Sequence, residues 1–282
     1  MMKKEAILNY MISVLFERVE RAGKIEVSDE VVLLENTSDR DIDDLEKRFR
    51  EAKAFVEEKK GQKLGKMQYK LYPMEELYEK FGRPKRFHGK YGAIYDDEED
   101  VYYLSGKSLE TDSLVHETVH KYQNETGILD VYNSIKNTEF EPVSWMLCEG
   151  DAMRLDLIFS CKRVPKKDSS KPTILPFRSL IKYAAARSGL INTDTREINY
   201  KKFINLGEIM YRPLSIFLGE YKAHDYLKGA QYLCQLEDLG GEDFIDFALC
   251  FPQKELTKPA ELHSYYQETL KRLEGMISHY RE

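Results

Sequence analysis

The sequence contains two histidines and a glutamate at a spacing that suits metal-dependent hydrolysis. His116, Glu117 and His120 form the pattern His-Glu-x-x-His. Residues four apart in an α-helix differ by about 40° around the axis and about 6 Å along it, so both imidazoles leave the same face. Glu117 projects from the adjoining face, about 100° from His116. This arrangement predicts two neutral nitrogen ligands for a zinc ion and a nearby carboxylate that accepts a proton from water.

The residues around the motif favour the helix that this arrangement requires. Thr111, Asp112 and Ser113 precede the motif, and all three residue types are good N-caps. Gly127 suits the first position beyond the end of a helix. Apolar residues of the same segment predict that the helix packs in the protein interior: Leu114, Val115, Val119 and Tyr122.

A catalytic zinc site usually has a third protein ligand, and several downstream carboxylates could supply it. A third histidine close to the motif is excluded because none follows it until His224. Glu149 differs from the other carboxylates because it lies within an apolar helical pattern over 142–160, where an unpaired carboxylate is costly. Gly150 beside it would allow a neighbouring helix or the metal site to approach closely. The other candidates are Asp130, Glu139, Glu141, Asp151 and Asp156.

These motifs resemble those of the gluzincins, the thermolysin-like and aminopeptidase-like zinc metallopeptidases. In that clan a Glu-Gly-x-Ala motif on a later helix often follows His-Glu-x-x-His, and this chain has Glu149, Gly150 and Ala152. The resemblance implies a Zn²⁺ ion with three ligands: His116, His120 and Glu149. It implies that Glu117 is the general base of a metallopeptidase acting on peptide or protein substrates. It also implies that substrate backbone pairs with the edge of a predicted hairpin over 91–104.

The sequence differs from these families in two of their motifs. Thermolysin-like sequences have a supporting aspartate four residues after the glutamate ligand, where this chain has Met153; Asp156 could return to the Glu149 face instead. The aminopeptidase Gly-x-Met-x-Asn signature is absent, which argues against an N-terminal exopeptidase.

Peptide hydrolysis also needs a donor for the developing oxyanion, and tyrosine and histidine can serve. Tyr226 is the first choice because of its Tyr-x-x-Gly context. The alternatives are Tyr211, Tyr221 and His224. Trp145 and Met146 are expected in the core.

Composition excludes several classes of partner. The chain has 282 residues, 43 basic and 49 acidic, for a net charge of −6, and it lacks the basic block typical of nucleic-acid binding. No stretch has the length and apolar character of a membrane span. We therefore expect a cytoplasmic protein, or a secreted one if a leader was removed.

The four cysteines form no Cys-x-x-Cys pair and are expected to be reduced. A disulfide between Cys234 and Cys250 is the alternative.

Hydrophobic periodicity predicts an α+β fold. Residues 1–110 are expected to form a small α/β lobe with a strand near 25–34, a strand at 67–72 and the hairpin at its edge. Residues 111–282 are expected to form a mainly helical lobe, with the zinc-binding helix at the cleft. Helices beyond the first zinc motif are predicted over about 142–160, 175–187, 200–220, 225–239, 242–249 and 259–279.

Three functional classes fit these observations. A zinc metallopeptidase is favoured because a purely structural zinc site has no need of Glu117. The alternative is a zinc-binding pseudoenzyme or scaffold of the same fold. A helical interaction protein with an accidental motif would leave Glu149 unexplained.

Overall fold

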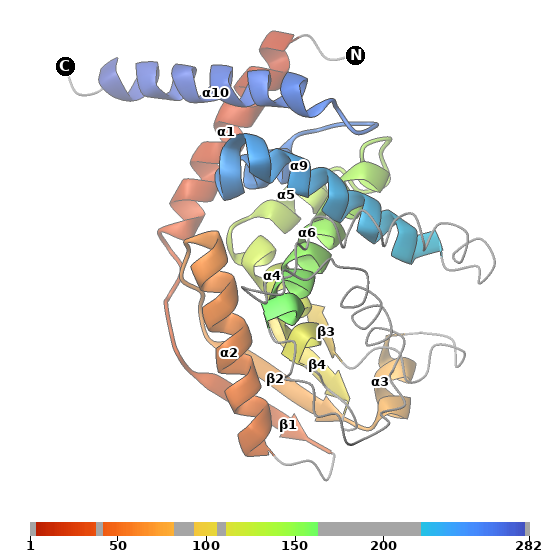
Figure 1. Ribbon diagram of the computed structural model, residues 1–282. Coiled ribbons are helices and arrows are strands. Elements are labelled where there is room, and N and C mark those ends of the chain that lie inside the picture. The colour runs from red at the N-terminus through yellow and green to blue at the C-terminus, as the bar shows by residue number, and fades with distance from the viewer. Residues whose placement is uncertain (1–3, 38–41, 82–92, 106–110, 163–220, 280–282) are drawn as a thin grey trace, which may run out of the picture.

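The computed structural model describes residues 4–37, 42–81, 93–105, 111–162 and 221–279 (Figure 1). The strands in these ranges are β1 Val31–Asn36, β2 Met67–Tyr72, β3 Ala93–Asp96 and β4 Val101–Ser105. The helices are α1 Lys4–Ala22, α2 Ile42–Lys60, α3 Met74–Lys80, α4 Thr111–Glu125, α5 Ile128–Ser134, α6 Glu141–Lys162, α9 Tyr221–Cys250 and α10 Pro259–His279. The α+β class is confirmed. The helices predicted over 175–187 and 200–220 lie outside the described residues.

The described strands form one mixed sheet in the order β1-β2-β4-β3. β1 runs parallel to β2, which runs parallel to β4, and β3 is antiparallel to β4. The predicted hairpin is therefore confirmed, with Tyr95 opposite Tyr102, and β3 is an edge strand. The first strand starts at Val31, later than the sequence pattern suggested.

Helices cover both faces of this sheet, and β4 is buried along its whole length. On one face, Phe49 of α2 packs edge-on against Tyr102, with ring centroids 5.1 Å apart. On the other face, Leu77 of α3 packs with Val101 and Tyr103. Burial on both faces explains why Val101–Leu104 form an unbroken run of apolar and aromatic residues in β4 rather than alternating with charged ones.

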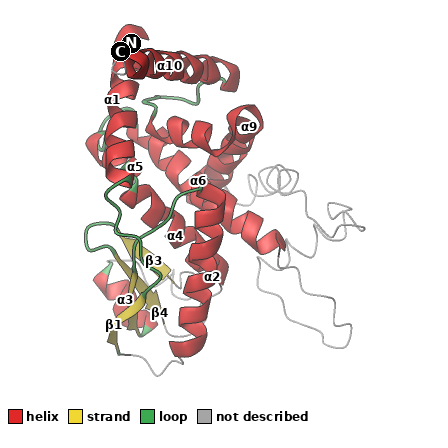
Figure 2. Cartoon of the chain, turned by 90° about the vertical axis from the view of Figure 1, so that its left-hand side faces the viewer, coloured by secondary structure: helices red, strands yellow, loops and turns green. Residues whose placement is uncertain are grey.

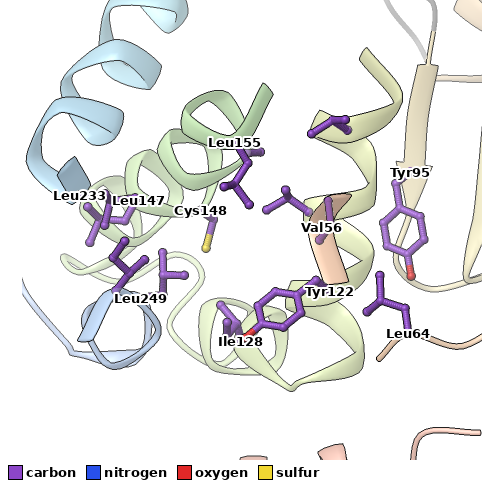
Figure 3. Close-up of a cluster of buried hydrophobic side chains, with 14 of the residues drawn as sticks. Val56, Leu64, Tyr95, Tyr122, Ile128, Leu147, Cys148, Leu155, Leu233 and Leu249 are labelled. Atoms are coloured by element: carbon purple, nitrogen blue, oxygen red, sulfur yellow. The ribbon is translucent and has the colours of Figure 1, made fainter. Parts of the chain in front are cut away.

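One apolar core joins residues from α1, α2 and the sheet to residues from α4, α6, α9 and α10. Figure 3 shows Leu147, Cys148 and Leu155 of this core beside Leu233 and Leu249. Residues on both sides of position 110 therefore share a core, and the division into two lobes around a cleft stays a prediction. The sheet lies at one end of the molecule and the pair α1 and α10 at the other (Figures 1 and 2).

Glycines mark helix ends and a helix break, as the sequence suggested. Gly127 has a φ of 78° and lies between α4 and α5, a short helix that the sequence analysis did not predict. Gly241, with a φ of 69°, interrupts α9 where two separate helices were expected. Glycine adopts a left-handed φ at the least cost, so both positions favour that residue type.

Two expectations from composition can be compared with the structure. Cys148, Cys234 and Cys250 are buried free thiols, so reduced cysteines are confirmed for these three residues and the Cys234–Cys250 disulfide is not formed. Among the described helices, none is long and apolar enough to cross a bilayer.

Candidate metal centre

Helix α4 presents the two motif histidines together, as their spacing predicts. Leu114, Val115 and Val119 are fully buried in the core, which fixes the rotation of the helix about its axis. The imidazoles of His116 and His120 point away from that core and remain partly exposed. Their Nε2 atoms are 3.3 Å apart.

Glu149 of α6 completes a group of three potential ligands. Its Oε2 atom lies 3.3 Å from His116 Nε2 and 3.7 Å from His120 Nε2. Neighbouring ligand atoms in a tetrahedral zinc site with bonds near 2.0–2.1 Å are about 3.3 Å apart. The separations therefore match what one zinc ion requires. The three side chains are 15–18% exposed.

Close contact between two helix backbones positions Glu149. A Cβ added at Gly150 would lie 2.6 Å from the carbonyl carbon of Gly229, and one at Gly229 would overlap the Met146 carbonyl oxygen. Helices α6 and α9 therefore touch at a point where neither has a side chain. This confirms that Gly150 permits close approach, and it places the start of α9 beside the three potential ligands.

Gln123 orients His120 and was missed in the sequence analysis. Its side chain is fully buried. Its Oε1 lies 2.9 Å from His120 Nδ1, while its Nε2 donates to the carbonyl oxygen of Cys148 at 3.0 Å. Because the amide NH₂ is used by Cys148, Oε1 must accept a hydrogen from Nδ1. When the imidazole is neutral, this hydrogen bond leaves the lone pair on His120 Nε2, the atom facing Glu149.

The central glutamate of the motif is held by the sheet edge. The backbone N–H of Tyr95 in β3 donates to Glu117 Oε2 at 2.9 Å. Burial raises the pKa of the Glu117 carboxyl, although the positive charges of His116 and His120 act in the opposite direction. A raised pKa makes a carboxylate a stronger base and suits it to proton transfer near neutral pH.

Glu149 and His120 shift each other's pKa values in opposite directions. Burial acts against the charged forms, but hydrogen bonds and charge from His116 and His120 hold the pKa of Glu149 well below its usual range. Despite its burial, the hydrogen bond and charge of Glu149 raise the pKa of His120 to about 9. A proton held by His120 is one that a bound cation would displace.

Tyr226, the first choice for an oxyanion donor, lies beside this group. Its ring centroid is 6.4 Å from that of His116 and 5.1 Å from that of Trp145. Tyr211 lies outside the described residues, and the side chains of Tyr221 and His224 are not described. Met146 is buried as expected, but the core prediction was incomplete for Trp145, which packs against the core while staying partly exposed.

The other candidate carboxylates interact elsewhere. Asp151 is fully buried, 2.9 Å from Lys60 and 3.0 Å from Arg154. Glu139 pairs with Lys254 on the surface. The remaining candidates have the following partners: Asp130 contacts Arg21, Glu141 accepts from Tyr132, and Asp156 accepts from Ser160.

Comparisons with protein-family models, curated proteins and solved structures found no match to this chain. The function must therefore be inferred from the site itself. Its geometry combines two imidazoles and the carboxylate of Glu149, which could hold a metal ion, with the carboxylate of Glu117 beside the edge strand β3.

Proposed function

We propose that this protein is a zinc-dependent metallopeptidase that hydrolyses peptide bonds. The observation that carries the proposal is the convergence of His116, His120 and Glu149 at separations suited to one zinc ion. Glu117 is held beside them by the backbone N–H of Tyr95, and burial raises the pKa of its carboxyl. Purely structural zinc sites are closed by four protein ligands, whereas three protein groups leave a position open.

Each residue of the site has its own role in the proposed reaction. A bound zinc ion would polarise the peptide carbonyl and lower the pKa of a water molecule to about 7. Glu117 accepts the proton of that water and later delivers it to the leaving amine. The Tyr95 N–H occupies one carboxylate oxygen of Glu117, which leaves the other for the proton. Tyr226 donates a hydrogen bond to the developing oxyanion, a contribution of roughly 3–4 kcal/mol in comparable sites.

The edge strand β3 offers a place for an extended substrate. Because β3 pairs only with β4 among the described strands, no described strand occupies its other edge. The hydrogen bond from Tyr95 to Glu117 lies on this side, so a peptide aligned with β3 would pass close to the base.

The test compares Glu117→Gln with the unchanged protein on a peptide library and measures bound zinc in both. We expect full zinc content and a loss of hydrolysis of about 10²–10⁴-fold, because the amide cannot accept the proton. Glu139→Gln, which changes an exposed glutamate on the surface, is the matched control and should keep both properties. Activity unchanged in Glu117→Gln would contradict the mechanism. Zinc binding with no hydrolysis by the unchanged protein would favour the scaffold alternative.

A further inference from the structure

Helix α4 carries a second row of polar residues beside the row that faces the candidate metal centre. The metal-facing row occupies positions 116, 120 and 123. The second row consists of the residues one position later in the chain: Glu117, Lys121 and Asn124. One residue turns about 100° around a helix, so this row faces another direction. Each of its members contacts β3 or the turn that follows it, so the second row faces the β3–β4 hairpin.

The phenol of Tyr95 is one point where the hairpin meets this row. Its Oη accepts a hydrogen bond from Asn124 Nδ2 at 2.9 Å and donates one to Asp100 Oδ1 at 2.6 Å. The same amide of Asn124 donates to the carbonyl oxygen of Asp97 at 3.0 Å. Tyr95 therefore contacts α4 twice, through its phenol and through the backbone N–H that donates to Glu117.

Lys121 ties the turn of the hairpin to the protein interior. Its side chain is fully buried, and its Nζ lies 2.6 Å from Asp100 Oδ1 and 2.7 Å from Glu125 Oε1. Glu125 accepts in turn from the backbone N–H of Gly65, in the connection between α2 and β2, at 3.1 and 3.2 Å. A buried ammonium is costly without its carboxylate partners, so Lys121 fixes the position of Asp100. Asp100 has a φ of 53°, a backbone conformation that a residue other than glycine keeps only when its surroundings hold it.

These contacts decide whether the Tyr95 N–H reaches Glu117. Tyr95 lies opposite Tyr102 in the antiparallel pair, but its N–H donates to Glu117, so these two residues do not exchange hydrogen bonds. The pairing with β4 therefore leaves this N–H directed toward α4. Its distance from Glu117 depends on how closely the hairpin lies against α4, which the phenol of Tyr95 and Lys121 determine.

We propose that Lys121 and the phenol of Tyr95 are positioning residues for the general base. They hold the hairpin against α4, so that the Tyr95 N–H keeps the Glu117 carboxylate beside the candidate metal centre. This inference rests on the proposed peptidase function. Displacement of a catalytic group by about 1 Å can cost about 100-fold in rate, so a fixed hairpin has a direct effect on turnover.

The test replaces Lys121 by methionine and follows the hairpin and turnover separately. In protein with isotope-labelled tyrosine, NMR gives the hydrogen exchange of the Tyr95 amide, which reports its contact with Glu117. Lys121→Met should speed this exchange about tenfold relative to that of Tyr103 within the sheet. In zinc-loaded protein, kcat should fall about 10–100-fold with KM and zinc content unchanged. Lys53→Met, which removes a buried lysine 3.4 Å from Glu57 on α2, is the matched control and should change neither property.

A second variant serves if Lys121→Met does not fold. Asn124→Ala removes the donor to the Tyr95 phenol at a partly exposed position and should also speed exchange of the Tyr95 amide. Exchange no faster than in the control would overturn the inference, and so would faster exchange with unchanged kcat. Absence of hydrolysis by the unchanged protein would overturn the peptidase function instead. The exchange measurement needs neither zinc nor substrate, so it still decides whether these contacts hold the hairpin.

Discussion

Replacing Gln123 by methionine should weaken zinc binding without unfolding the protein. The substitution removes the acceptor at 2.9 Å from His120 Nδ1 and the donor at 3.0 Å from the Cys148 carbonyl, in a fully buried position. Methionine has a similar length, so little space is left empty. Loss of a hydrogen-bond partner behind a metal ligand costs about 10–100-fold in metal affinity, or about 1.4–2.8 kcal/mol. The Cys148 carbonyl keeps its hydrogen bond within α6, but the Nδ1–H of His120 loses its acceptor, which lowers the folding stability of the metal-free and the zinc-loaded protein by about 1–3 kcal/mol.

Two assays separate these effects. Competition with a chromophoric chelator at pH 7 gives the zinc dissociation constant, and urea denaturation of the metal-free protein gives the free energy of unfolding. Gln253→Met is the matched control, because Gln253 is also buried and accepts a hydrogen bond from the Thr257 N–H at 2.9 Å, in the connection between α9 and α10. It should lower stability and leave zinc affinity unchanged. A zinc affinity of Gln123→Met within about twofold of the unchanged protein would refute the role of Gln123.

Two further predictions concern the framework around the site. Gly229→Ala should destabilise the protein by about 1–3 kcal/mol in urea denaturation, because the added methyl group overlaps the Met146 carbonyl oxygen. Gly275→Ala in α10, where nothing lies within 4 Å of the added group, should instead stabilise it by about 0.5–1 kcal/mol. Stability should also fall in acid because, although burial opposes the shift, two buried cations hold the pKa of Asp246 at about 2, below its ordinary 3.8. The carboxylate favours the folded state above pH 3.8, and this contribution of about 2 kcal/mol is lost as the pH falls toward 2.

Each of these predictions has an outcome that contradicts it. Equal stabilities of Gly229→Ala and Gly275→Ala would show that the α6–α9 contact tolerates a side chain. For the acid dependence, the comparison is Asp246→Asn, which should be less stable at pH 6 and should lose less stability between pH 4.5 and about 2.5. Parallel pH dependence of the two proteins would exclude Asp246 as the source.

The local part of the site could be predicted from the sequence because it depends on helical spacing. His116, Glu117 and His120 lie within one helix, and their arrangement follows from its geometry. Glu149 was identifiable because a carboxylate in an apolar helix needs a partner. Gln123 was missed although it lies three residues after His120, on the same face of the helix. Because residues three apart are neighbours on a helix, this spacing could have indicated a contact between Gln123 and His120.

Contacts between distant segments could not be predicted in the same way. The Tyr95 N–H that holds Glu117 is a backbone group, and every residue except proline has one. Asp100, in the acidic turn before β4, pairs with Lys121, which is completely buried on α4. Only the tertiary arrangement decides which carboxylate meets a buried lysine. Trp145 was assigned to the core from its residue type. Its position four residues before Glu149 indicated that it lies on the face of α6 that carries Glu149.

Zinc analysis of the purified protein and of Glu149→Ala tests the central claim most directly. The account predicts close to one equivalent of zinc in the unchanged protein and a marked loss in the variant, because one of three ligands is removed. Circular dichroism of both proteins checks that the variant remains folded. An unchanged protein that binds no metal even after incubation with zinc would contradict the account, and the His-Glu-x-x-His pattern would then be a coincidence of sequence.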